Sequence, residues 1–565
     1  MNRLGTSLWI LAASLAAATV APAQPVDDAA ADDDPYPDDL TATGSAEPAP
    51  SPADAPASPD APVPVQPGVP AVTPTAVYQP PVAGTTTTTP TTDSTTAAPT
   101  TSTTTSTTTA SASTHSTTAT PATTSPAAPT ATAEPEAGHP EDGFKFGTYG
   151  RVGIAWDGRG GTAGPFSVVS HGPRLEQPVY LELDLGYGMH PTEEIGLRML
   201  ATVAVFDDLF HFTGDPVQSL AIRNLYLEST WRDTLRLWAG SRMYRGDDVY
   251  LFDWWPLDNL NTVGGGAGVD IGAYRLAAHV GMNRLDDEWQ TQYFSVPDPV
   301  FGSREVLTVD RPRTVASLKV ERLALPESPG ELGWKVALYG EGHFISSGTL
   351  VHPDRTEEWL PDDQGWVAGV QGGLWTAGGN FLNLWLRTAG GLAAYGELAI
   401  PFGVDQEKRA LGATEFAIVA AGNLELDWFG LLGGSYARWF EDADRNQYDL
   451  DDAWEFALAL RPHFYLNDWF HVALEASYQL RKSAGLAVES GEPETPQIWK
   501  FAVMPMWVPL GRGTLSRPQL RFVYQLSLPN DAARNTLPED DPRRAHDVEH
   551  FIGLQVEWWY NSSYR

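Results

Sequence analysis

The sequence predicts an all-β fold: a transmembrane antiparallel β-barrel of about 18 strands, preceded by a disordered N-terminal segment. Three observations support this prediction. The chain begins with an apolar leader, continues with a long segment of low complexity, and ends in a part where apolar and polar residues alternate with a period of two. No stretch after residue 23 has 18 uninterrupted apolar residues, so we expect no membrane-spanning helix.

Residues 1–23 have the pattern of a secretory signal peptide. Arg3 is the only charge, an apolar run extends from Leu8 to Val20, and small residues follow at Ala21-Pro22-Ala23. An uncleaved anchor is the alternative, but the run is short for a membrane span. We therefore expect the mature chain to work beyond the inner membrane.

Residues 24–143 consist mostly of Ala, Pro, Thr, Ser and Asp, without Lys or Arg. Such a composition buries too little apolar surface to offset the entropy of ordering the chain. Pro and β-branched Thr keep it extended. We interpret this segment as a disordered periplasmic tether, and its Thr runs leave a glycosylated stalk open.

Residues 144–565 show the alternation of half-buried strands. In residues 180–185, Leu alternates with Tyr180, Glu182 and Asp184, and in residues 552–560 apolar residues alternate with Gly, Gln, Glu and Trp559. A soluble β-sandwich also alternates but rarely reaches about 400 residues as one unit. The pattern therefore favours a barrel whose strands face lipid on one side and a wet lumen on the other.

Composition excludes several functions. The formal net charge of −35 argues against a nucleic-acid partner, and the absence of Cys excludes disulfides and thiolate sites. Residues 144–565 alone carry a net charge of −21. This acidic excess predicts a lumen with more Asp and Glu than a neutral pore and a mild preference for small cations, while charge on the outer loops would be screened by salt.

Aromatic and charged residues on the lumen face suit sugars as ligands. The apolar face of a pyranose ring stacks on an aromatic ring, and its hydroxyls bond charged side chains. The alternative is a girdle of interfacial aromatics, which would share the lipid face. Tyr180 and Trp559 fall on the polar face, whereas Trp558 and Tyr560 fall on the lipid face.

Several motifs resemble one family. LWAGSRMYRGDDVYLFDWWPLDNLNTVGGGAG (237–268) is similar to the third-loop region of the maltoporin family, trimeric sugar-specific porins of the outer membrane. FGTYGRVGIAWDG (146–158) resembles the first strand of that family, and SRPQLRFVY (516–524) and FIGLQVEWWY (551–560) resemble its last strands. The similarity covers residues 144–565.

The resemblance implies an 18-stranded barrel, a homotrimer embedded in outer-membrane lipid, and a third loop folded inward to narrow the pore. It implies an oligosaccharide substrate, either maltodextrin-like or a disaccharide. The matching aromatic positions, which would guide the sugar as a slide or form the constriction, are Tyr149, Tyr180, Phe381, Trp559, Trp255 and Phe212. The matching charged positions, which would bond sugar hydroxyls, are Arg151, Arg174, Glu182, Arg223, Asp248 and Asp253.

This chain departs from the family at several of these places. Leu515 stands where the slide has a Trp, and Trp255 replaces the constriction Tyr of maltose-type members. Gly246 aligns with a third-loop arginine, for which the neighbouring Arg245 is a candidate substitute. The chain also continues five residues past Tyr560, where family members end on an aromatic.

Two further motifs resemble metal sites. His546–His550 spells H-x-x-E-H, but it follows Pro542 and adjoins a strand pattern, so we expect a loop rather than a zinc site. Residues 442–446 begin like a calcium loop, yet the sixth and twelfth places lack the required Gly and Glu. We predict no metal, no cofactor and no enzyme activity.

The sequence leaves two other functions open. A general diffusion porin would use the same barrel without sugar selectivity, and the departure at Leu515 leaves room for it. An envelope tether or adhesin would use residues 24–143 as the working part and the barrel as its anchor.

Overall fold

The computed structural model describes residues 142–563, apart from 178, 207–219, 284–289, 299–301, 327–330, 352–354, 397, 400, 402, 445–451, 487–491 and 539. The predicted signal peptide and almost all of the predicted tether lie outside the described residues, as does Phe212. Within the described part, no α-helix has the length and apolar character needed to cross a membrane.

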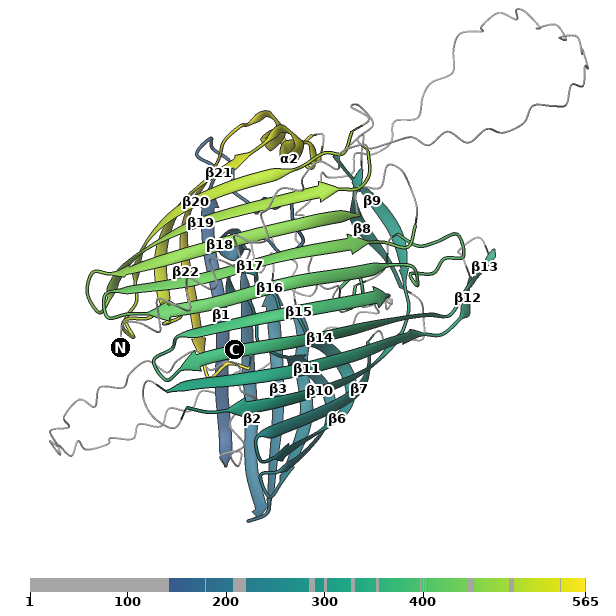
Figure 1. Cartoon of the computed structure of the whole chain (residues 1–565), viewed down its shortest axis with the longest axis vertical. Helices are drawn as coiled ribbons and strands as arrows, with labels where there is room; N and C mark the ends of the chain where they lie inside the picture. The colour runs from purple at the N-terminus through teal and green to yellow at the C-terminus, as the bar shows by residue number, and fades with distance from the viewer. Residues whose placement is uncertain are drawn as a thin grey trace, which may run out of the picture. The chain divides into compact units, whose positions relative to one another are not determined.

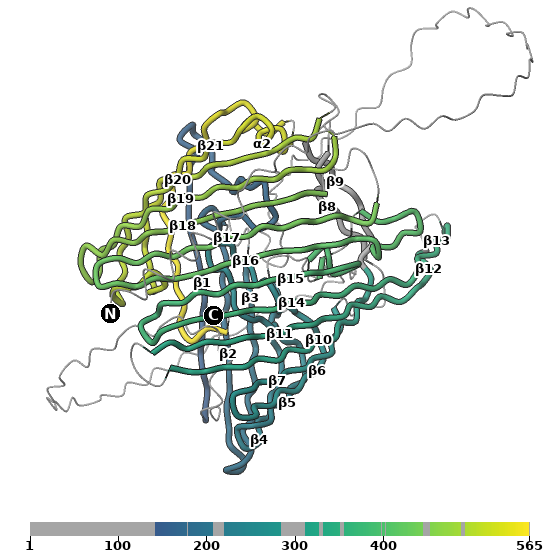
Figure 2. The backbone as a smooth tube through the Cα atoms, in the orientation of Figure 1, coloured from purple at the N-terminus to yellow at the C-terminus, as the bar shows by residue number. Residues whose placement is uncertain are grey.

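Eighteen strands form one closed antiparallel barrel, which confirms the predicted fold class. Each strand pairs with its successor, and β22 pairs with β1 to close the wall. Figure 1 shows these strands side by side. In Figure 2 the colour moves from teal at β14 to yellow at β21, so strands that follow one another in the chain are neighbours in the wall. The barrel strands are Gly143–Trp156 (β1), Tyr180–Thr192 (β2), Ile195–Phe206 (β3), Leu220–Trp231 (β4), Leu235–Arg245 (β5), Asn259–Ile271 (β6), Tyr274–Asn283 (β7), Arg313–Ala324 (β10), Leu332–Ile345 (β11), Asp363–Thr376 (β14), Phe381–Gly391 (β15), Thr414–Glu425 (β16), Phe429–Glu441 (β17), Ala453–Tyr465 (β18), Phe470–Ser483 (β19), Gln497–Trp507 (β20), Gln519–Pro529 (β21) and Glu549–Tyr560 (β22).

The remaining elements lie in connections between barrel strands. Two hairpins occur there, Gln290–Asp298 (β8) with Gly302–Asp310 (β9), and Gly348–Val351 (β12) with Glu357–Leu360 (β13). The helical turns are Arg174–Glu176 (η1), Tyr250–Phe252 (η2), Asp531–Asn535 (α2) and Pro542–Ala545 (η3).

Short and long connections alternate along the chain. Residues 193–194 and 272–273 are tight turns, whereas residues 157–179 (the first loop), 246–258 (the third loop) and 392–413 are long. Because β1 starts and β22 ends beside the tight turns, both termini of the barrel lie at this end, which we call the short-turn end. In bacterial outer-membrane barrels, short turns face the periplasm.

The strands show the predicted alternation. Large apolar side chains such as Ile154, Leu338 and Trp499 are about half exposed on the outer face, where a membrane barrel meets lipid. Tyr180 and Glu182 are buried on the inner face. The period of two assigns each residue to lipid or lumen because successive side chains of a strand point to opposite sides.

The third loop folds into the barrel, as the resemblance implied. Its apolar residues, 249–252 and Trp254, are buried and pack against small inward residues of β16 and β18, including Ala417 and Ala459. Gly434 on β17 allows the closest approach, since a Cβ there would lie 2.7 Å from Val249 Cγ1. Each large apolar side chain buried in this way contributes about 1.5–3 kcal/mol to holding the loop across the lumen.

The first loop also turns inward and packs on the third. Phe166 and Val168 join the same apolar cluster, and the His171 ring stacks on Trp254 with centroids 4.2 Å apart. Burial, aided by the charge of Arg438, holds the pKa of His171 well below its usual value. A neutral imidazole is therefore built into this loop contact.

The residues after β22 turn back into the lumen at the short-turn end. Asn561 has a φ of 45°, and the Ser563 hydroxyl donates to Asp184 Oδ1 at 2.8 Å. The same hydroxyl lies 3.3 Å from Thr202 Oγ1. The extension beyond Tyr560 thus narrows this end of the lumen.

Candidate functional site

Four of the predicted aromatic residues meet at one place on the inner wall. Tyr149 of β1 pairs in register with Trp559 of β22, and Tyr180 of β2 lies beside them, with its ring centroid 5.9 Å from that of Tyr149. The third loop brings Trp255 into the same cluster. Strand register sets the positions of Tyr149, Tyr180 and Trp559, whereas the position of Trp255 depends on how the third loop folds.

Trp255 is held in place by Arg245. The Arg245 guanidinium lies 3.8 Å from the centroid of the indole, within the range of a strong cation–π contact. At Gly246, where the resemblance expects an arginine, a Cβ would overlap a carboxylate oxygen of Asp258. The guanidinium beside Trp255 is thus that of Arg245.

Two lysines, on β10 and β11, anchor the two ends of the third loop. Lys319 of β10 bonds Asp258 at 2.8 Å, and Lys335 of β11 bonds Asp247, which also accepts a hydrogen bond from Gln371. Burial raises the pKa of Asp258 against the pull of Lys319. The pKa of Asp247 is lowered because Lys335 and Gln371 outweigh burial. These anchors were missed from sequence because the paired residues are far apart in the chain.

The charged residues beside Tyr180 form a compact group. Its hydroxyl donates to Glu182, which in turn pairs with Arg223 at 3.3 Å. The guanidinium groups of Arg151 and Arg223 each lie 5.3 Å from the Tyr180 ring centroid. The apolar ring of Tyr180 and the charged groups of this site are therefore next to each other.

Asp253 joins the third loop to the barrel wall. Its carboxylate lies 3.6 Å from Arg151 Nη1 and 3.5 Å from Arg174 Nη1. Its φ of 50° is in the left-handed region, which Asp tolerates better than most residues. This backbone conformation ends η2, and two residues later the chain presents Trp255.

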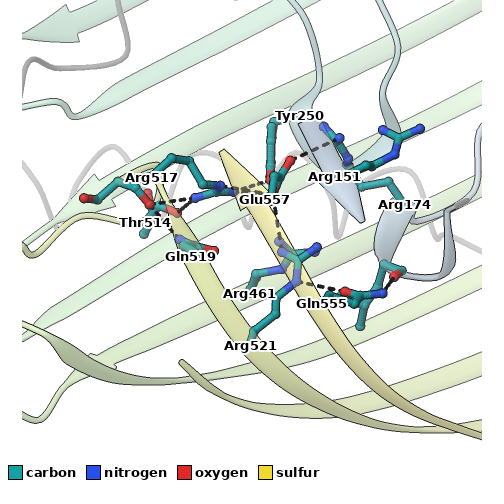
Figure 3. Close-up of polar contacts among 12 residues, drawn as sticks. Arg151, Arg174, Tyr250, Arg461, Thr514, Arg517, Gln519, Arg521, Gln555 and Glu557 are labelled. Carbon is teal, nitrogen blue, oxygen red and sulfur yellow. Dashed lines mark hydrogen bonds and ion pairs between the residues drawn. The ribbon is translucent and has the colours of Figure 1, made fainter. Parts of the chain in front are cut away.

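Glu557 is the centre of the polar network drawn in Figure 3. Its carboxylate lies 3.3 Å from Arg174, 3.0 Å from Arg517 and 3.4 Å from Arg521. It also accepts hydrogen bonds from Tyr250 at 2.8 Å and from Tyr149 at 3.2 Å.

Tyr250 lies in the third loop, outside the membrane-spanning strands. Burial opposes ionisation of its phenol, but the charges of Arg517, Arg174 and Arg461 outweigh burial and lower its pKa.

Sequence reasoning missed Glu557, Tyr250, Arg517 and Arg521 as site residues. Strand parity placed Glu557 and Arg521 on the lumen side, and the SRP motif contained Arg517, so a signal existed for each of these three. Three guanidinium groups converge on the Glu557 carboxylate among the described residues.

The other predicted residues lie apart from this group. Phe381 begins β15 at the short-turn end and packs, with Leu515, against the apolar cluster of the third loop. Trp559 packs against both clusters and so connects them. Asp248 is half-buried in the third loop, and Phe212 lies outside the described residues.

The two metal-like motifs form no metal site in the described residues. His546 Nδ1 lies 2.9 Å from Glu549 Oε1, and His550 contacts Tyr524, so the motif spans a loop and a strand start, as expected. No group of three potential ligands occurs in the described part of the chain. Of the calcium-like motif, only its first three residues, 442–444, are described.

Comparisons with known proteins agree with the architecture. The sequence model described as LamB porin matches residues 144–560. A maltoporin of Vibrio cholerae serotype O1 is 30% identical over 138 residues, a stretch that covers 23% of this chain and 29% of that protein.

Two solved structures illustrate the structural likeness. OmpT, an outer membrane protein of Vibrio cholerae, is 12% identical and covers 74% of this chain and 99% of its own, with a TM-score of 0.36. OccAB4 of Acinetobacter baumannii is 11% identical and covers 75% of this chain and 99% of its own, with a TM-score of 0.39.

Proposed function

Because this chain belongs to the LamB porin family and forms an outer-membrane channel, we propose that it mediates facilitated diffusion of sugars. The substrates are maltodextrin-like oligosaccharides or disaccharides. They travel along an aromatic slide made of Tyr149, Tyr180, Trp559 and Phe381, past a constriction at Trp255.

The observation that carries this proposal is the gathering of four aromatic rings beside charged groups on the lumen wall. Trp559, the least buried of the four, offers an apolar face to a pyranose ring, and Tyr149, Tyr180 and Trp255 pack in the same cluster. Arg151, Arg174, Glu182, Arg223 and Asp253 lie beside these rings and offer charge-assisted hydrogen bonds to hydroxyls. We assign the same role to Asp248 of the third loop. Many weak contacts of this kind let a solute bind and still leave.

Planar-bilayer conductance tests the proposal. Purified protein is reconstituted, and maltose, maltotriose and sucrose are titrated while the ion current is recorded. We expect concentration-dependent block by at least one of these sugars, since a bound sugar occupies the constriction. If none blocks the current, the channel is a general diffusion porin, the alternative for which the departure at Leu515 leaves room.

We further propose an oligomeric state for the channel and a side of the membrane for its N-terminal segment. The family resemblance supports a homotrimer embedded in outer-membrane lipid. The barrel chain begins at the short-turn end, which faces the periplasm in such barrels, so residues 24–143 form a tether on the periplasmic side. In that position the tether cannot act as an adhesin on the cell surface.

A further inference from the structure

We propose that the residues after β22 set the width and the charge of the sugar path at its short-turn end. Residues 561–563, which we call the exit strap, lie against the lumen wall beside the aromatic slide and shield the carboxylate of Asp184 from the channel. The inference rests on the proposed function for the nature of the solute, whereas the effect of the strap on ions is measured without any sugar.

The exit strap lies one step along the strands from the slide. Gly147 of β1 pairs in register with Asp184 of β2, and two residues further along both strands Tyr149 pairs with Glu182. Two residues of a strand span about 7 Å, and residues two apart share a face of the sheet. A solute that leaves Tyr149 toward the short-turn end therefore passes the strap.

A row of residues on four neighbouring strands receives the strap. Asp184 of β2 pairs in register with Gly147 of β1 on one side and with Thr202 of β3 on the other. Asn224 of β4 continues the row, since it pairs with Thr202. Asp184, Thr202 and Asn224 are 3%, 0% and 4% exposed, although all three face the lumen. The strap is thus part of the cover over a polar section of the wall.

Gly147 leaves the space that the strap occupies. A Cβ at this position would lie 2.2 Å from the backbone oxygen of Asn561, closer than real Cβ atoms approach another heavy atom. Asn561 itself has a φ of 45°, a left-handed conformation that Asn tolerates better than most residues, and it redirects the chain directly after Tyr560. A side chain at position 147 is therefore incompatible with the strap in its present place.

Asp184 holds the strap through its carboxylate. The Ser563 hydroxyl donates to Oδ1 at 2.8 Å, and the Ser563 backbone N–H donates to Oδ2. The Thr202 hydroxyl donates to Oδ1 as well. Hydrogen bonds to an ionised acceptor are about twice as strong as those between neutral groups. Because these three donors are neutral, they stabilise the carboxylate without cancelling its charge.

Loss of the strap has two separable consequences. The path becomes wider, because the strap no longer occupies space along the wall. The path also becomes more negative, because the Asp184 carboxylate then faces the lumen. A carboxylate that lines a narrow passage raises the local concentration of cations.

The test is single-channel recording in planar bilayers with three variants. Deletion of residues 561–565 removes the strap and leaves the chain ending on Tyr560, an aromatic residue, as family members do. Gly147→Ala keeps the sequence of the strap but fills its place. Gly186→Ala is the matched control, because Gly186 is also a buried glycine of the lumen face and a Cβ there would meet no atom closer than 3.6 Å. Heat-modifiable mobility on a gel verifies that each variant folds.

We expect the deletion and Gly147→Ala to raise the conductance in KCl by the same factor, and the two changes combined to raise it no further, since both act through the strap. The reversal potential in a KCl gradient shifts toward cation preference in both variants. Adding Asp184→Asn to the deletion abolishes this shift and keeps the higher conductance. Gly186→Ala retains the wild-type values. Blocks by maltotriose become shorter in the deletion variant, because a wider exit lets the sugar leave sooner.

Unchanged conductance and reversal potential after the deletion overturn the inference, because the strap then lies outside the path of ions. Sugar block of the wild-type channel would in that case still support the proposed function. A cation shift that survives Asp184→Asn overturns the role given to Asp184. If Gly147→Ala does not fold, the deletion with and without Asp184→Asn decides. Higher conductance and a cation shift without block by any sugar refute the proposed function and leave the strap as a constriction for ions.

Discussion

Replacing Trp255 by Ala tests the mechanism at its narrowest point. The indole is almost fully buried among Tyr149, Tyr180 and Trp559, with Arg245 over its face. Its removal leaves a gap beside the slide, so single-channel conductance should rise. The same change removes one stacking surface for the sugar, so block should weaken.

The size of the loss follows from the contacts of one ring. An aromatic contact contributes about 0.5–1.5 kcal/mol, which corresponds to roughly a few-fold to tenfold change in sugar affinity. Trp255→Tyr restores the phenol of maltose-type relatives and should recover most of the block while keeping a slightly wider pore. The assay is single-channel recording in planar bilayers with and without sugar.

Trp507→Ala is the control for this experiment. Trp507 ends β20 and is 46% exposed on the outer face, so its loss should change neither conductance nor block. If Trp255→Ala also changes neither quantity, Trp255 does not narrow the path of ions and sugars. The slide mechanism is then refuted, even though the barrel remains.

Three further outcomes are expected. Trp559→Ala should weaken sugar block by a similar factor but leave conductance nearly unchanged in the same recordings, because this ring lies on the wall rather than on the loop. Deleting residues 30–140 should leave the barrel folded, as measured by its heat-modifiable mobility on a gel. Protease added to intact cells should leave residues 24–143 uncut, and cleavage there would reverse the proposed topology. Lys335→Met removes the ion-pair partner of the buried Asp247 and should destabilise the third loop by about 3–5 kcal/mol. We expect this loss to appear as current noise and as a lower melting temperature. The double variant with Asp247→Leu should recover much of the lost stability.

The alternation of apolar and polar residues was enough to predict the strands of the barrel wall. Alternation in residues 180–185 and 552–560 assigned each side chain to lipid or lumen, because a strand has a period of two wherever it lies in a barrel. The strand number followed from length, since each strand and its connection use about 23 residues. Motifs that resemble a known family then supplied the inward third loop.

Contacts between the third loop and the barrel wall could not be predicted in this way. Lys319 of β10 and Asp258 at the end of the third loop are 61 residues apart in the chain, and nothing near either residue in sequence marks the other as its partner. The substitution of Arg245 for position 246 was left open for the same reason. Only the folded loop shows that Asp258 occupies the space beside Gly246 while Arg245 covers Trp255.

The sequence by itself determined the fold class, the lumen-facing set of residues and the candidate slide. The tertiary structure decided which of those residues act together. Glu557 meets Arg174 from the first loop, Tyr250 from the third and Arg517 from the turn before β21, because barrel closure and inward loop folding bring segments 40 to 383 residues apart to one place. Net composition counts charges but does not locate them, so it did not indicate that three guanidinium groups converge on Glu557.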